Sequence, residues 1–148
     1  MTGVVRHTGL YEWEGVRRLD YKSEAGTHFK QVTRQVLSEG SPDLFAELRY
    51  FEVAPGGHST LERHDHVHLV LIGRGGGHCL VGDVVSAVNP LDAVIVPPLT
   101  WHQFRATGTE PLGFFCVVAR ERDRPQLPGA RDIEALSADP AVKAFIRV

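Results

Sequence analysis

The chain has 148 residues, a formal net charge of −2 and 43% hydrophobic residues, a composition that fits one ordinary globular domain. The near-neutral charge argues against a nucleic-acid-binding protein, which usually presents a basic face. The sequence shows neither a run of about 18 apolar residues, as a membrane span requires, nor an apolar N-terminal stretch typical of a signal peptide, so we expect a cytoplasmic protein. Histidine is the unusual feature, because the chain has eight.

Short apolar runs alternate with glycine- and proline-containing turns from residue 28 to about residue 120, a pattern typical of strands joined by tight turns. Because no helical period appears there, we expect an all-β protein. The predicted strands span residues 28–37, 45–53, 59–64, 68–72, 78–81, 84–88, 93–96, 101–105 and 112–118. Residues 1–27 carry enough apolar side chains to pack, and we expect an arm or an edge strand there.

Residues 121–148 differ from the rest, because a charged segment is followed there by helix signals. Asp139 and Pro140 are typical of an N-cap and the first helical position, and we expect the helix to continue over residues 141–146. A helix of one or two turns is predicted over residues 132–136. We expect this tail to pack back on the strands or on a second subunit.

Four titratable side chains occupy alternate positions in one stretch: Glu62, His64, His66 and His68. Side chains alternate between the two faces of a strand, so all four would share one face of an unbroken strand. Neutral imidazole and carboxylate groups are metal ligands, so the pattern predicts a metal site. Residues four apart in a straight strand are about 13 Å apart, too far to share one ion. The chain must therefore bend between His64 and His68, and a new strand should begin at His68.

A further histidine, His102, opens a predicted strand after a double-proline turn, where an antiparallel barrel can bring it to face the cluster. The remaining histidines are isolated in the sequence, and we interpret them as surface or structural residues: His7, His28, His58 and His78. Cys79 and Cys116 lie in apolar, strand-like runs, and we interpret them as free buried thiols.

The region from Pro55 to about Phe104 resembles the cupin superfamily of small antiparallel β-barrels. The first cupin motif spaces two histidines and a glutamate between two glycines. That spacing is kept here by Gly56, Glu62, His64, His68 and Gly75. The residue types are permuted, because Glu62 stands at the first histidine position and His68 at the glutamate position.

The second cupin motif is matched by Pro97 and His102, whereas leucine or alanine replaces its two glycines and its asparagine, at Leu91, Leu99 and Ala106. The resemblance implies one cupin-type, jelly-roll-like barrel over residues 28–120, with an N-terminal arm over 1–27 and a short helical tail over 121–148. Together these parts would make a single domain, residues 1–148.

The resemblance also implies one divalent first-row metal ion (Fe, Mn, Ni, Zn or Cu), held by three histidines and a carboxylate or by four histidines. The first ligand set is Glu62, His64, His68 and His102, and in the second set His66 replaces Glu62. We favour the first set, because it leaves residues 65–67 free to form the turn. His66 would then lie at the mouth of the site as a substrate contact, a proton carrier or an occasional ligand, with Asp65 as its partner.

If His68 and His102 point inward, alternation brings Val70, Ile72, Thr100 and Phe104 inward too, so we expect a mostly apolar substrate pocket. The candidate polar contacts are Tyr50, Arg49, Glu47 and Gln103. Lysine is missing from this predicted pocket, which disfavours sugar-phosphate isomerases and lysine-dependent chemistry.

Such a site suits a small organic substrate that binds the metal through oxygen. The resemblance points first to a cupin dioxygenase, in which a redox metal binds both substrate and O₂. One alternative is a non-redox isomerase, lyase or decarboxylase, with His66 or Glu62 as the catalytic proton carrier. Another is a non-catalytic module that binds a small ligand or a metal. We also expect a homodimer, since pairing would cover an exposed edge strand.

Overall fold

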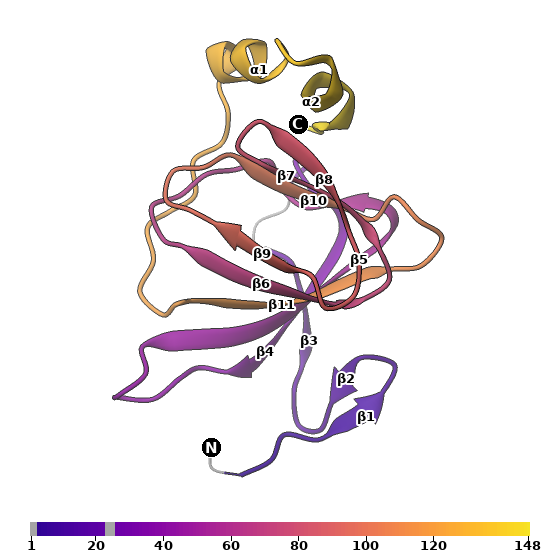
Figure 1. Cartoon of the computed structure of the whole chain (residues 1–148). Coiled ribbons are helices and arrows are strands. Elements are labelled where there is room, and N and C mark those ends of the chain that lie inside the picture. Colours follow the sequence, from indigo (N-terminus) through magenta and orange to yellow (C-terminus); the bar gives the residue numbers. More distant parts are fainter. Residues whose placement is uncertain (1–2, 23–25) are drawn as a thin grey trace.

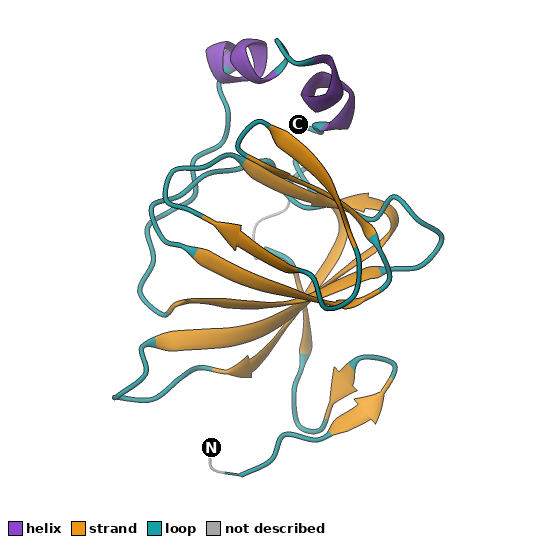
Figure 2. Ribbon diagram, in the orientation of Figure 1, coloured by secondary structure: helices purple, strands orange, loops and turns teal. Residues whose placement is uncertain are grey.

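The computed structural model describes residues 3–22 and 26–148. The strands in chain order are β1 (His7–Gly9), β2 (Glu12–Trp13), β3 (Arg18–Asp20), β4 (Lys30–Ser38), β5 (Ala46–His58), β6 (His68–Arg74), β7 (Gly77–Val81), β8 (Val84–Val88), β9 (Ala93–Val96), β10 (His102–Arg105) and β11 (Leu112–Ala119), followed by the helices α1 (Ala130–Leu136) and α2 (Pro140–Phe145). The expected all-β architecture with a short helical tail is confirmed, as Figure 2 shows.

Strands β3 to β11 form one antiparallel sheet that curls around a core, with the order β8-β7-β10-β5-β11-β6-β9 and with β4 between β3 and β5 (Figure 1). The sheet turns a corner within β5. Residues 46–53 of β5 pair with β11, whereas His58 pairs with Arg105 of β10. Gly56 between these two parts has φ of 79°, and the register with β4 shifts there. A glycine bulge of this kind bends a strand, so β5 can serve both walls of the barrel.

The predicted strand over residues 59–64 is wrong, because β5 continues through the expected turn and ends only at His58. The next residues form two isolated bridges, Glu62 with His102 and Arg63 with Gln126. Their backbone groups thus bond to two different neighbours instead of one strand. The bend expected before His68 is confirmed, because the chain bends at Asp65 and His66 and β6 begins at His68.

The main apolar core fills the inside of the curled sheet and includes Val70, Ile72 and Phe104. A second cluster joins the tail to the barrel, where Val142 and Phe145 of α2 pack on Leu61 and Leu80. The side chain of Asp139 accepts hydrogen bonds from the first backbone N–H groups of α2, as the sequence predicts for an N-cap. The tail therefore closes one end of the barrel.

The N-terminal arm makes both of the structures that the sequence leaves open. β3 pairs with β4 at the edge of the sheet, and β1 with β2 forms a hairpin at the end of the molecule opposite the helices (Figure 1). Tyr11 of the arm stacks on Tyr50, and Trp13 packs at an angle against Tyr50 and Phe115, so the arm covers this outer face of the sheet. Within the described ranges, none of the helices is long and apolar enough to cross a membrane.

Two residues that replace the glycines of the second cupin motif adopt left-handed backbone, Leu91 with φ of 75° and Leu99 with φ of 54°. Side-chain-bearing residues rarely adopt this conformation, because Cβ approaches a carbonyl oxygen. The turns around β9 therefore keep the glycine-type geometry of the motif without the glycine.

We expect Leu91→Gly to stabilise the protein. Left-handed backbone costs an L-residue roughly 1–2 kcal/mol, and glycine loses about 0.5–1 kcal/mol more on folding, so the free energy of unfolding should rise by up to about 1.5 kcal/mol. Little burial is lost, because Leu91 is 80% exposed. Val84→Gly, at an exposed strand position, is the matched control and should destabilise. Chemical denaturation measures the free energy of unfolding of both variants. A lower value for Leu91→Gly than for the parent protein would contradict the backbone strain inferred at Leu91.

Candidate metal centre and basic cavity

Three histidines from two separate parts of the chain converge at one point of the barrel. Each of His64, His68 and His102 offers one ring nitrogen, and these atoms lie within 4.8 Å of one another. His64 and His102 are buried and His68 is half-buried. These are the three residues that both expected ligand sets share.

The backbone fixes two of these histidines relative to each other. Glu62 and His102 exchange both backbone hydrogen bonds, at N···O distances of 3.2 and 3.0 Å, and the N–H of Leu99 donates to the carbonyl of His64 at 2.7 Å. The left-handed turn at Leu99 thus holds the loop before His102 against the loop that carries His64. His68, the first residue of β6, is placed by its pairing with β9 and β11.

The hydrogen bonds of the rings leave the nitrogens that a metal would need. Nδ1 of His64 lies 2.7 Å from the carbonyl oxygen of His66, and Nδ1 of His102 lies 2.9 Å from that of Thr100. A ring that donates through Nδ1–H presents a lone pair on Nε2. Nε2 of His64 is buried and has no hydrogen-bond partner among the described residues. This donor set fits a divalent first-row cation.

Burial also keeps the rings neutral, as metal coordination requires. Burial, together with the nearby His102, lowers the pKa of His64 to about 4. Burial lowers the pKa of both His68 and His102. At neutral pH all three neutral imidazoles can therefore donate a lone pair to a metal ion.

The two candidates for a fourth ligand each have another partner. A carboxylate oxygen of Glu62 lies 2.7 Å from Nζ of Lys22. The ring of His66 stacks on that of His64 with centroids 3.6 Å apart, and its Nδ1 lies 2.7 Å from a carboxylate oxygen of Asp123. Both residues lie beside the three histidines, and the fourth ligand remains a prediction.

Asp123, in the segment after β11, is the acidic partner of His66 in place of the expected Asp65. Its two carboxylate oxygens accept hydrogen bonds from the backbone N–H groups of Asp65 and His66 as well as from the His66 ring. These hydrogen bonds, that of Asp65 first, lower the pKa of Asp123. Asp123 therefore holds the turn that carries His66 over the cluster.

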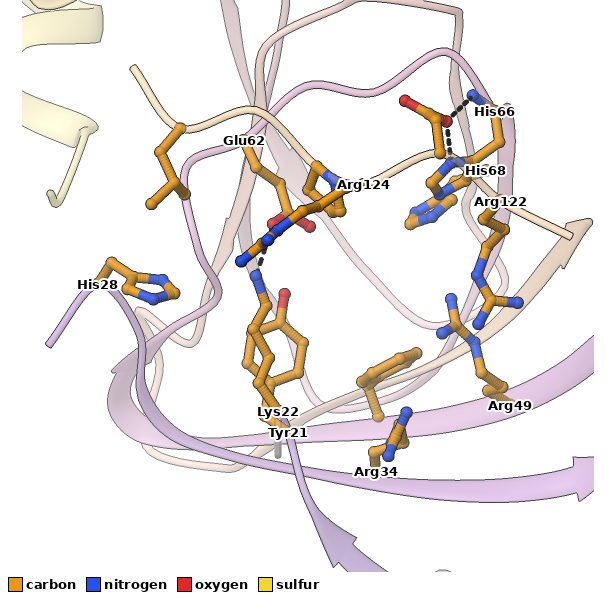
Figure 3. Close-up of a pocket in the computed structure, with 14 residues that line it drawn as sticks. Tyr21, Lys22, His28, Arg34, Arg49, Glu62, His66, His68, Arg122 and Arg124 are labelled. Atoms are coloured by element: carbon orange, nitrogen blue, oxygen red, sulfur yellow. Dashed lines mark hydrogen bonds and ion pairs between the residues drawn. The ribbon is translucent and has the colours of Figure 1, made fainter. Parts of the chain in front are cut away.

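A cavity of about 330 Å³ opens beside the histidines (Figure 3). Its lining is Tyr21, Lys22, His28, Arg34, Arg49, Phe51, Glu62, His66, His68, Arg122, Asp123, Arg124, Pro125 and Leu127. Five of these side chains are cationic and two are carboxylates. The expectation of a pocket without lysine is therefore wrong, because Lys22 reaches into the cavity from the arm, and the argument against sugar-phosphate isomerases and lysine-dependent chemistry fails with it.

A smaller cavity of about 30 Å³ lies deeper in the barrel, where Glu62 and His68 line both spaces. Its apolar wall is made by Phe51, Phe104 and Phe114, with Cys116 beside them. Burial raises the pKa of the Cys116 thiol, which is thus neutral, as expected of a buried cysteine. The two spaces together join a charged mouth to an apolar interior.

The expected substrate contacts are divided among three places. Phe104 lines the deeper cavity, whereas Val70 and Ile72 lie in the core and line neither space. The prediction that Tyr50 contacts the substrate is wrong, because its side chain lies on the other side of the sheet, under the arm. Its hydroxyl donates a hydrogen bond to Glu52 there. The prediction that Gln103 is a polar substrate contact is also wrong, since its side-chain amide forms hydrogen bonds with the backbone of Ser59 and Arg147.

Comparison with known proteins agrees with the fold. Residues 49–118 match the family model of the Cupin domain. A 1-methylthio-D-xylulose 5-phosphate methylsulfurylase of Rhodospirillum rubrum is 57% identical over 136 residues, which cover 92% of this chain and 86% of the relative. The chain belongs to the cupin superfamily.

Solved cupin structures follow the same backbone. A cupin 2 conserved barrel domain protein from Rhodopseudomonas palustris has a TM-score of 0.93 and 50% identity, with 99% of this chain and 100% of the other covered. A cupin-2 domain protein from Rhodospirillum rubrum has a TM-score of 0.85 and 56% identity, with 93% and 91% covered. The arm and tail of this cupin therefore lie within the aligned region.

We expect this cupin to bind one divalent metal ion per chain and His102→Ala to remove most of it, because His102 provides one of the three converging nitrogens. His78→Ala is the control, since that ring bonds Thr107 away from the cluster. Elemental analysis after reconstitution measures the metal content. Full retention of metal in His102→Ala would show that the second motif supplies no ligand.

The fourth ligand can be tested by one pair of variants. If Glu62 completes the site, Glu62→Gln should weaken metal binding by at least about tenfold and more than His66→Ala does, since a neutral amide is a poorer donor than a carboxylate. Competition with a chelator measures both affinities. The opposite order would favour the four-histidine set.

Proposed function

We propose that this cupin is a metal-dependent enzyme that removes the methylthio group from a methylthio-ketose phosphate, with 1-methylthio-D-xylulose 5-phosphate as its substrate. The observation that carries the proposal is the cationic cavity beside the three histidines, five positive side chains against two carboxylates. A phosphate ester carries a charge of about −1.5 to −2 at pH 7, so such a cavity attracts it. The name of the 57% identical Rhodospirillum rubrum relative supplies the rest of the substrate.

The shape of the site suits such a molecule from end to end. The phosphate and hydroxyl groups match the polar mouth, and the methylthio group matches the apolar wall of Phe104 and Phe114. Between these ends lies the histidine cluster, beside which the ketone oxygen would be placed. A divalent ion held by His64, His68 and His102 would supply Lewis-acid polarisation of that ketone.

The chemistry of the substrate limits how its C1–S bond can break. Loss of methanethiolate would leave a cation next to a carbonyl, whereas electrons left on C1 can be delocalised into the ketone as an enolate. The sulfur must then pass to a nucleophile. An external thiolate forms the new S–S bond as the C1–S bond breaks, and the enolate takes up a proton at C1. Burial raises the pKa of the Cys116 thiol, so it is a poorer nucleophile for this step than an external thiolate.

The chain offers two groups for that proton. Glu62 lines both cavities and is held by Lys22, while His66 lines the outer cavity and is oriented by Asp123. A positioned carboxyl or imidazole of this kind is what general acid catalysis requires. We assign the delivery of the proton to one of these two residues.

The activity is tested with metal-loaded protein, 1-methylthio-D-xylulose 5-phosphate and a small thiol. We expect the 1-deoxy ketose phosphate and the mixed methyl disulfide in equal amounts, at the same rate with and without air. His102→Ala should lower turnover at least about 100-fold, since it removes a ligand. The absence of product with every metal tested would refute the proposal. Turnover that requires O₂ and consumes it would instead support the dioxygenase that the motifs first suggested.

A further inference from the structure

We infer that Arg34, Arg49 and Arg122 form the subsite that binds the phosphate group of the substrate. The inference rests on the proposed function, which supplies the identity of the phosphate-bearing substrate. What it adds is the position of the phosphate group in the cavity. It places the phosphate on the wall made by β4 and β5, beside His68, so that the sugar runs from this wall to the histidine cluster.

The sheet register brings two of these arginines together. In the antiparallel pair β4 and β5, Arg34 lies opposite Phe51 and Arg49 lies opposite Val36. Side chains two apart in a strand share a face, so Arg34 and Arg49 are diagonal neighbours on the inner face. The segment after β11 adds Arg122, and Figure 3 shows Arg49 and Arg122 on the same side of the cavity as His68.

Arg49 is buried without a partner of matching strength. Only 7% of the residue is exposed, yet its contacts are the Cys116 sulfur at 3.8 Å, the Glu47 carboxylate at 4.0 Å and the face of the Phe51 ring at 4.9 Å. Its Nε makes no hydrogen bond with any residue that the structure describes. Buried guanidinium groups are normally paired with carboxylate or phosphate, so Arg49 is poised for an anionic ligand.

The guanidinium of Arg34 also has a buried nitrogen, Nε, without a hydrogen-bond partner within the described part of the chain. Burial, and then the charge of Arg49, lowers the pKa of Arg34. The register of β4 and β5 makes the two residues diagonal neighbours on one face of the sheet. An anion between them would relieve the repulsion between their charges.

The charge balance matches a phosphate dianion. Glu47 is the carboxylate that contacts this group, at 2.8 Å from Arg122 and 4.0 Å from Arg49. Three guanidinium groups and one carboxylate leave two positive charges. Lys22, in contrast, is already paired with Glu62 at 2.7 Å, so its charge is compensated. The positive charge left uncompensated beside β4 and β5 is therefore that of Arg34, Arg49 and Arg122.

Calorimetric titration of the metal-loaded protein with inorganic phosphate and with D-xylulose 5-phosphate tests the inference without turnover. Arg34→Gln should lower the affinity for both ligands by about 10- to 100-fold, because one or two charge-assisted hydrogen bonds are lost. Arg49→Lys should lower both affinities similarly, because lysine keeps the charge but loses the bidentate fork. Arg131→Gln, on α1 outside the cavity, is the matched control and should bind as the parent does.

Metal content and thermal unfolding of each variant exclude a folding or metal-binding defect as the cause. Unchanged phosphate affinity in Arg34→Gln, or a loss confined to Lys22→Met, would overturn the inference. The proposed function fails separately: Arg34-dependent phosphate binding without turnover of the methylthio substrate would refute the activity and keep the subsite. Turnover whose KM is unchanged in Arg34→Gln would keep the activity and refute the subsite.

Discussion

The site depends on the backbone bonds between two loops that are far apart in the sequence. Glu62 and His102 exchange both of their backbone hydrogen bonds, and Leu99 donates to the carbonyl of His64. These bonds decide that His64 and His102 approach each other, and the start of β6 brings His68 to the same point. Nε2 of His64 is buried without a hydrogen-bond partner among the described residues, a costly state that a bound ligand would relieve.

The cavity outside the histidines depends on a different constraint, the placement of buried cations. Arg34 and Arg49 come from the inner face of the sheet, Arg122 from the segment after β11, and Lys22 from the arm. Charged groups lose hydration when they are buried, so each needs a carboxylate or a ligand anion. Glu47 and Glu62 supply part of this compensation. The remaining positive charge would favour an anionic ligand in the cavity.

The segment that follows β11 connects the two regions. Asp123 holds the turn that carries His66, while the preceding residue, Arg122, bonds Glu47 beside Arg49. A sequence pattern could not reveal this, since the segment has neither strand nor helix periodicity. Its charged residues are typical of a solvated loop, and only their contacts give them a role in the site.

The sequence by itself determined the barrel, the helical tail and three of the histidines that converge in the structure, because strand alternation, turn residues and the motif spacing around His64, His68 and His102 can be read along the chain. It failed where local patterns gave the wrong boundary, as at residues 59–64, or the wrong face, as at Tyr50. The tertiary structure alone decided the partner of His66 and the cationic lining of the cavity. Those contacts join residues more than fifty positions apart in the case of Asp123, and they depend on how the arm, the sheet and the segment after β11 close around one space.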